Sequence, residues 1–228
     1  MPPLSQVSLA VAFLAAAWGS FVAMSPPHPS AAVASDSAPS SDLFQKLGLT
    51  RSYSAAVGLA PTLTLALYTA LTALRFDPAR PARLPGHGVA NGINPALLTW
   101  SPATAVPLAL LLLGAIPLRL LAYAHLGRNF TFALAAPSGL QTAGVYAWVQ
   151  HPAYTSFVTL VCAHLWLFCR TDGAQAAMWS PMLPVVLGGL VYIVRERVVQ
   201  EEGMLKELFG RVWVEWHGKT ARFVPGVF

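Results

Sequence analysis

The stretch that decides the fold is Ala153–Val194, AYTSFVTLVCAHLWLFCRTDGAQAAMWSPMLPVVLGGLVYIV. It holds two apolar runs, 153–169 and 174–194, separated only by Arg-Thr-Asp-Gly. A helix needs about 20 mainly apolar residues to cross the ~30 Å of hydrocarbon in a bilayer. The short connection predicts that the two helices run antiparallel, so that their outer ends emerge on the same side of the membrane.

The composition of the whole chain agrees with a bilayer as its solvent. Of 228 residues, 55% are hydrophobic and only 10% are charged, and the mean hydropathy is +0.56. Three more apolar runs lie at 4–24, 53–74 and 102–124, and Arg119 near the end of the last can reach the headgroups. We therefore predict an all-α integral membrane protein with about five transmembrane helices and a C-terminal amphipathic helix.

The first apolar run leaves two interpretations open. Ala32-Val33-Ala34 has the small-x-small form of a signal-peptidase site, which would make residues 1–34 a cleaved signal. However, no Lys or Arg precedes the run, and the candidate site lies well beyond its end. These two features favour a retained helix.

The positive charge of the chain points to lipid and not to nucleic acid. The net charge is +5, but the 14 Lys and Arg residues are spread along the sequence and form no dense patch of the kind that phosphate backbones require. Anionic lipid headgroups are the simpler partner. Most of these basic residues fall on the side that carries the loop 127–152 and the C-terminal tail, which predicts that this side faces the cytosol.

The sequence becomes polar after Val194. All five glutamates lie in this tail: Glu196, Glu201, Glu202, Glu207 and Glu215. Apolar residues recur on one face between positions 196 and 209, which predicts an amphipathic helix that Gly210 ends. The pattern also favours Trp213 and Trp216 as anchors at the membrane interface.

The antiparallel pair of helices brings the loop 127–152 and the tail to the same membrane face. These two segments hold most of the polar functional groups of the chain. The loop side carries Tyr146, Trp148, His151 and Tyr154, and the tail carries Arg197, Glu201, Glu202 and Arg222. We therefore expect the functional site between them.

Three sequence motifs carry a resemblance to a known family. They are Gly144–Tyr154, GVYAWVQHPAY; the tail residues Arg197, Glu201-Glu202, Leu205 and Phe209-Gly210; and the ending Thr220–Gly226, TARFVPG. Together they resemble the isoprenylcysteine carboxyl methyltransferase family over roughly residues 125–228. The resemblance divides the chain into N-terminal membrane helices and linkers, 1–100, with no recognisable motif, and a methyltransferase core, 101–228.

The resemblance implies a multi-pass enzyme of the endoplasmic reticulum membrane with its active site facing the cytosol. Such an enzyme moves a methyl group from S-adenosylmethionine to the C-terminal carboxylate of a prenylated cysteine on a substrate protein. Arg197 would be the catalytic residue that meets the substrate, and Arg222 would bind substrate or a lipid phosphate. The implied cofactor-binding residues are Ser138, Gly139, Leu140, Gln141, Tyr146, His151, Pro152, Ala153, Tyr154 and Glu201. The sequence departs from the family at Gln150, where arginine usually precedes His-Pro, and this bears on the substrate more than on the cofactor.

The residue types suit methyl transfer on chemical grounds as well. Displacement at a sulfonium carbon needs alignment and exclusion of water, and it needs no nucleophilic side chain. An arginine can orient a carboxylate through paired hydrogen bonds, and aromatic rings attract a sulfonium.

Other interpretations remain open at this point. Arg197 and Glu201 are four residues apart and could form a simple surface ion pair, while Glu202 is either a ligand contact or a solvated neighbour. The histidines show no metal-ligand spacing, so no metal is expected. The alternative functions are a phospholipid N-methyltransferase acting on phosphatidylethanolamine, or a non-catalytic membrane protein; an amine substrate would gain nothing from Arg197.

Overall fold

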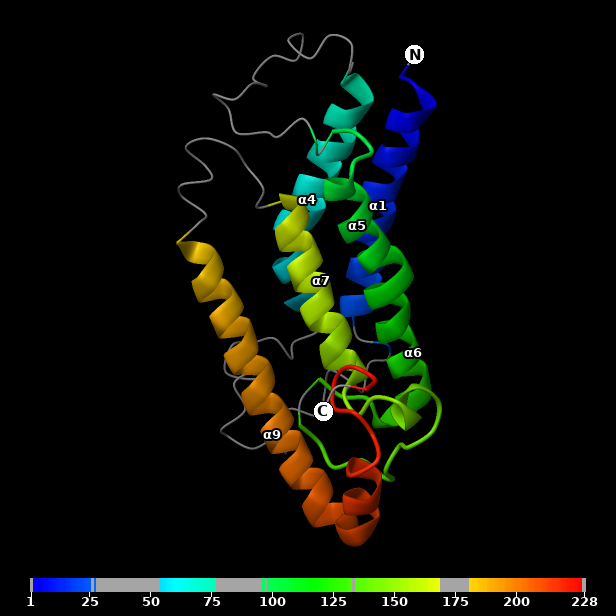
Figure 1. Ribbon diagram of the computed structural model, residues 1–228, viewed down its shortest axis with the longest axis vertical. Helices are drawn as coiled ribbons and strands as arrows, with labels where there is room; N and C mark the ends of the chain where they lie inside the picture. The colour runs from blue at the N-terminus through cyan, green and yellow to red at the C-terminus, as the bar shows by residue number, and fades with distance from the viewer. Residues whose placement is uncertain are drawn as a thin grey trace. The chain divides into compact units, whose positions relative to one another are not determined.

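The computed structural model describes residues 2–25, 27, 54–76, 96, 98–132, 134–168 and 181–226. Within these ranges every regular element is a helix, as predicted (Figure 1). The helices are α1 (Leu4–Met24), α4 (Ser54–Arg75), α5 (Pro102–Ala109), η4 (Leu110–Ala115), α6 (Ile116–Leu126), η5 (Gly127–Asn129), η6 (Gly144–Ala147), α7 (Pro152–Phe168) and α9 (Met182–His217).

Three stretches of the described chain are long and apolar enough to cross a membrane: Leu4–Met24, Val57–Arg75 and Pro102–Asn129. They coincide with the first three predicted spans. The third is one continuous helical stretch, in which the π-helical segment η4 joins α5 to α6. η4 begins shortly after Pro107, which has no N–H to donate to the regular hydrogen-bond ladder of the helix.

The last two predicted spans are described only in part. The fourth corresponds to α7, an apolar helix of 17 residues. The fifth predicted span covers 174–194, and its beginning lies outside the described residues, as does the Arg-Thr-Asp-Gly connection. The described remainder forms the first turns of α9, which then continues without a break into the polar tail.

The amphipathic helix of the tail ends at Gly210, as the sequence predicts. Gly210 has non-helical backbone angles, with φ 51° and ψ −121°, and a second helical segment follows it, so that α9 as a whole reaches His217. This combination of angles suits glycine alone among the common residues. Gly210 therefore ends the first helical segment and changes the direction of the chain in a kink, so that the last two turns of α9 can approach the loop before α7.

The chain forms two compact units that alternate along the sequence. The first comprises Met1–Val22, Gly58–Ile116 and Thr159–Leu187, and the second Ala23–Val57, Pro117–Val158 and Gly188–Phe228. In the first unit, Trp100 Nε1 donates to Ser8 Oγ at 2.9 Å and the rings of Phe13 and Phe168 lie 6.3 Å apart. The second unit contains the C-terminal motifs and is where the polar network lies.

The kink supplies a testable prediction on stability. Gly210→Ala should destabilise the protein by about 1–3 kcal/mol, because alanine is strained at this φ and ψ although no atom lies within 4 Å of the added methyl. Gly203→Ala is the matched control, since Gly203 is helical and equally open, and the substitution should stabilise by about 0.5–1 kcal/mol. Thermal unfolding in detergent measures both, and changes of the same sign would contradict the assignment of the kink.

Candidate functional site

The loop before α7 is shaped by a short helix and a glycine. Gly144 has φ +64° and begins η6, and a side chain there would collide with the ring of His125. The helix places Tyr146 inward, where only 6% of it is exposed. Burial, reinforced by the negative charge of Glu201, raises the pKa of Tyr146 above its ordinary value. Its hydroxyl therefore stays protonated and can act as a donor at neutral pH.

The C-terminal segment pairs with this loop through its backbone. Val149 and Ala221 form an isolated parallel bridge, in which the N–H of Gln150 donates to the Ala221 carbonyl at 2.8 Å. The N–H of His151 donates to the Arg222 carbonyl at 3.0 Å. The hydroxyl of Thr155 donates to the Phe223 carbonyl at 2.8 Å. The residues after α9 thus lie along the start of α7.

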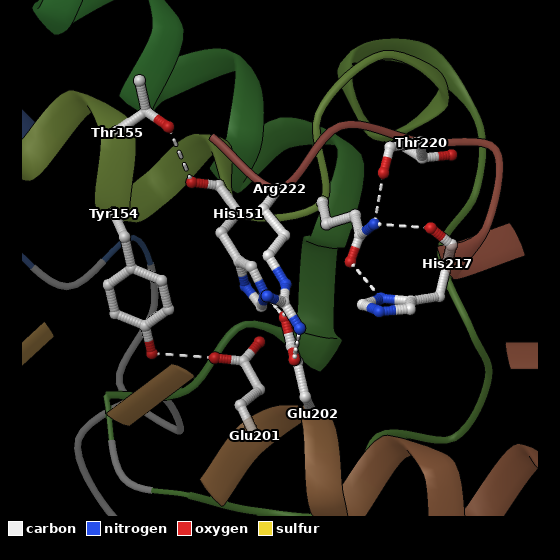
Figure 2. A network of polar contacts seen from close by, with 9 residues as sticks. His151, Tyr154, Thr155, Glu201, Glu202, His217, Thr220 and Arg222 are labelled. Carbon is white, nitrogen blue, oxygen red and sulfur yellow. Dashed lines mark hydrogen bonds and ion pairs between the residues drawn. The ribbon is translucent and has the colours of Figure 1, made fainter. Parts of the chain in front are cut away.

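Gln150 strengthens this pairing with its side chain. Its amide nitrogen donates to the carbonyls of Thr220 and His217, and its amide oxygen accepts from His217 Nδ1 at 2.7 Å (Figure 2). The His217 ring stacks on Trp213 with centroids 4.3 Å apart. Burial lowers the pKa of His217, which favours its neutral form. The residue that departs from the family pattern therefore joins the loop to the end of α9.

Glu202 is the buried centre of an ionic cluster whose other charged member, Arg222, is half-exposed. Glu202 is 9% exposed and accepts two hydrogen bonds from the guanidinium of Arg222, at 3.0 Å and 2.9 Å. His151 Nε2 lies 3.2 Å from the same carboxylate, and because an ionised carboxylate only accepts, this nitrogen carries the proton. Figure 2 shows His151 and Arg222 converging on Glu202 from two segments.

The pKa of Glu202 reflects the balance of these surroundings. Burial alone would raise it, but the hydrogen bonds and positive charge supplied by His151 and Arg222 outweigh burial, and the pKa is lowered overall. Glu202 therefore remains a carboxylate at neutral pH. The sequence leaves its role undecided between ligand contact and solvated neighbour, and the structure shows it fully engaged within the protein.

The neighbouring Glu201 faces a different partner. Tyr154 donates its hydroxyl proton to Glu201 Oε2 at 2.8 Å (Figure 2). The same hydroxyl accepts from Arg197 Nε at 3.2 Å. Arg197 is 5% exposed and also donates to the Phe132 carbonyl at 2.7 Å. The hydroxyl of Tyr154 therefore links Arg197, a buried cation, to the carboxylate of Glu201 one turn further along α9.

Most of the residues implied by the resemblance come together around this tyrosine. His151 precedes α7, Pro152 and Ala153 form its first turn, and Tyr154 follows them, so helix geometry fixes their spacing. The loop Ser138–Gln141 is placed differently. The N–H and hydroxyl of Ser138 donate to Asn129, and Gln141 donates to the Ala143 carbonyl, so the described hydrogen bonds of this loop remain local.

Sequence reasoning misses several members of the network. Trp216, for which the sequence favours a place at the membrane interface, donates its indole N–H to the Tyr146 carbonyl at 3.0 Å. Trp213 is 6% exposed. Gln150 and His217 carry no motif of their own. The one indication in the sequence is that the side-chain amide of Gln150 can both donate and accept hydrogen bonds, next to two backbone groups that need partners.

The Glu202 cluster predicts a pH-dependent contribution to stability. Because the folded-state pKa of Glu202 is lowered, its stabilising effect is present above the unfolded-state pKa near 4.5 and is lost as the pH falls through the folded value. Wild type should therefore melt above Glu202→Gln at pH 7, and this gap should close on acidification. Glu215→Gln, which removes an exposed ion pair with Arg211, is the control and should produce little gap at any pH. A gap that persists unchanged at low pH would contradict the role of the carboxylate charge.

Comparison with known proteins places these residues in a wider context. Residues 107–207 match the model of the isoprenylcysteine carboxyl methyltransferase (ICMT) family. Among curated proteins, the chain is 31% identical over 125 residues to "Protein-S-isoprenylcysteine O-methyltransferase B" of Arabidopsis thaliana, which is 53% of this chain and 58% of the relative. The chain thus spans little more than half the length of this relative. No solved structure matches the chain. The resemblance seen in the sequence over roughly residues 125–228 is confirmed as far as residue 207, where the match to the ICMT family model ends.

Proposed function

We propose that this protein is a protein-S-isoprenylcysteine carboxyl O-methyltransferase, with residues 101–228 as its methyltransferase core. It transfers a methyl group from S-adenosylmethionine to the C-terminal carboxylate of a prenylated cysteine. The observation that carries the proposal is the arrangement of Arg197, Tyr154 and Glu201, which sets a buried cation beside a carboxylate on the part of α9 that follows the apolar residues. The match of residues 107–207 supports the same reaction.

The residues near Glu201 suit the cosubstrate, which when bound supplies a methyl group on a cationic sulfonium. Glu201 is a half-buried carboxylate that can accept from an ammonium or from ribose hydroxyls. Gln200, which precedes it on α9, has a buried side-chain oxygen without a partner among the described residues. An unmatched buried acceptor is costly, so a ligand that brings N–H or O–H donors would relieve it. The rings of Tyr146 and Tyr154 add aromatic surface for a cation.

Arg197 is the residue we assign to the substrate carboxylate. A buried guanidinium presents its donors in a fixed plane, which suits a carboxylate better than an amine. Tyr154 and the Phe132 carbonyl hold two of its nitrogens and so fix its orientation. Arg222 stays a second candidate for the substrate, although in this structure both of its described hydrogen bonds go to Glu202.

The reaction then depends on alignment and on a dry site. Arg197 would hold the carboxylate with one oxygen directed at the methyl carbon, and Glu201 would fix the cosubstrate on the other side of Tyr154. No side chain has to act as a nucleophile or to accept a proton, because the attacking oxygen is already ionised. Burial of Arg197 and Tyr146 excludes water, which strengthens the electrostatic contacts.

A labelled-methyl assay tests the proposed function and its main competitor together. Purified protein in lipid with labelled S-adenosylmethionine should methylate a farnesylated cysteine analogue, and it should not methylate phosphatidylethanolamine. The expected preference follows from Arg197, which attracts a carboxylate and repels a protonated amine. Transfer to phosphatidylethanolamine alone would make the protein a phospholipid N-methyltransferase, and transfer to neither substrate would contradict both assignments.

Variants of two residues on α9 should separate the roles of substrate and cosubstrate. Arg197→Ala should lower kcat/KM about ten- to hundredfold, the loss of a charge-assisted contact of roughly 1.5–3 kcal/mol, while cosubstrate binding measured by calorimetry is retained. Glu201→Gln should instead weaken cosubstrate binding. The exposed neighbours provide matched controls, Arg195→Ala and Glu207→Gln, and neither should change either quantity. The opposite pattern would reverse the two roles.

We also propose that the protein resides in the endoplasmic reticulum membrane and that the site faces the cytosol. The support is the excess of Lys and Arg on the side of the loop and tail. An epitope tag fused after Phe228 should be digested by protease added to intact microsomes, while a lumenal marker stays protected. A protected tag would place the tail on the lumenal side and would reject this orientation.

A further inference from the structure

Arg119 lies within the third stretch that is long and apolar enough to cross a membrane, and its side chain is buried in the protein. It is 6% exposed. Its Nε donates to the Ala23 carbonyl at 2.8 Å, and its Nη1 donates to the Ala153 carbonyl at 2.7 Å. An ionisable side chain buried at membrane depth is costly and needs a compensating role. The partners of Arg119 show what that role is.

The first partner is the end of α1. Ala23 is fully buried and belongs to the last turn of α1, whose carbonyls have no partner within the helix. In a bilayer such a carbonyl must be satisfied by protein. Arg119 and Tyr123, one turn apart on α6, both donate to it, and the Tyr123 hydroxyl does so at 2.7 Å. This end of α1 is therefore capped by α6.

The second partner is the start of α7. Ala153 immediately precedes Tyr154, whose hydroxyl contacts Glu201 and Arg197. The Arg119 guanidinium also lies 5.9 Å from the ring centroid of Phe157 on the next turn of α7 and 5.2 Å from that of Tyr123. Arg119 thus holds the first turn of α7 in place. These contacts are separate from the polar contacts that Tyr154 of α7 makes with α9.

Arginine suits this position better than lysine. Its guanidinium presents donors in a rigid plane, so that Nε and Nη1 can reach two carbonyls in different directions at the same time. The three donors of a lysine ammonium share one nitrogen, whereas arginine presents two nitrogens that approach the two carbonyls separately. The two acceptors belong to residues 23 and 153, which are distant in sequence and are joined through residue 119.

We infer that Arg119 is a positioning residue of the site: by tying Ala153 to the end of α1 it fixes Tyr154 against Glu201 and makes the end of α1 a structural part of the site. α1 lies outside residues 107–207, so the match to the family model assigns it no role. The effect on cosubstrate binding rests on the proposed function, whereas the effect on the two helix ends does not.

The experiment compares Arg119→Met and Arg119→Lys with Tyr123→Phe, the matched control that removes a donor to Ala23 and leaves the contact with Ala153. Hydrogen exchange of the full-length protein without cosubstrate, read by mass spectrometry, reports directly on the two helix ends. Arg119→Met should speed exchange about tenfold or more in the peptide that covers residues 151–158, and Tyr123→Phe should leave that peptide unchanged. Arg119→Lys should fall between the two.

Calorimetry on the same samples then tests the link to the site. The dissociation constant for S-adenosylmethionine should rise about tenfold or more in Arg119→Met, recover in part in Arg119→Lys and stay within about twofold of wild type in Tyr123→Phe. A general loss of stability would lower the thermal midpoint of all three variants without changing the affinity of the folded protein.

Three results would overturn the inference. The first is equal exchange at residues 151–158 in wild type and Arg119→Met, and the second is unchanged affinity in that variant. The third is an intact mass of the purified protein that lacks residues 1–24, since Ala23 would then be absent. Failure of wild type to bind S-adenosylmethionine would contradict the proposed function, while the exchange measurement would still decide the role of Arg119.

Discussion

Glu202 accepts hydrogen bonds from His151 and from Arg222, and this buried carboxylate determines how the polar parts of the second unit fit together. His151 belongs to the motif that begins α7, Glu202 to the middle of α9, and Arg222 to the segment after α9. An isolated carboxylate in this position would be strongly disfavoured, so the three segments have to meet if the charge is to be tolerated. The backbone pairing of Gln150 and His151 with Ala221 and Arg222 follows from the same approach.

Two adjacent glutamates can serve different partners because of helix geometry. Side chains of consecutive helical residues point about 100° apart, whereas residues three apart lie on the same face. Glu201 and Glu202 are consecutive on α9, while His151 and Tyr154 are three apart at the start of α7. The first glutamate meets Tyr154 and the second meets His151. Glu202 therefore takes part in an internal ionic contact, whereas Glu201 is a half-buried carboxylate beside Arg197 and Tyr154.

The sequence predicts the features that depend on length and periodicity. The helices α1, α4 and α5–α6 begin and end within a few residues of the expected positions, because bilayer thickness sets their length. The sequence also predicts that the loop before α7 and the tail meet, because the short connection between the two apolar runs makes them antiparallel, and Tyr154 does contact Arg197 and Glu201. What the sequence does not reveal is pairing that depends on the three-dimensional approach of backbone carbonyls, as at Gln150, Arg119 and Trp216. The helix stop at Gly210 is predicted correctly, but the second helical segment that follows it as far as His217 is not indicated by the sequence.

The position of residues 220–223 after α9 has a consequence for biogenesis. The polar network draws on the loop before α7, on α9 and on residues 220–223, which follow α9 in the chain. Contacts between distant parts of a chain form only after the intervening loop has closed. Glu201 and Glu202 are synthesised before Arg222 and Phe223, so their partners in the C-terminal segment are added later. A chain that ended before Arg222 would contain α7 and α9 but would lack the residues that pair with the start of α7. The complete site therefore requires translation at least as far as Phe223.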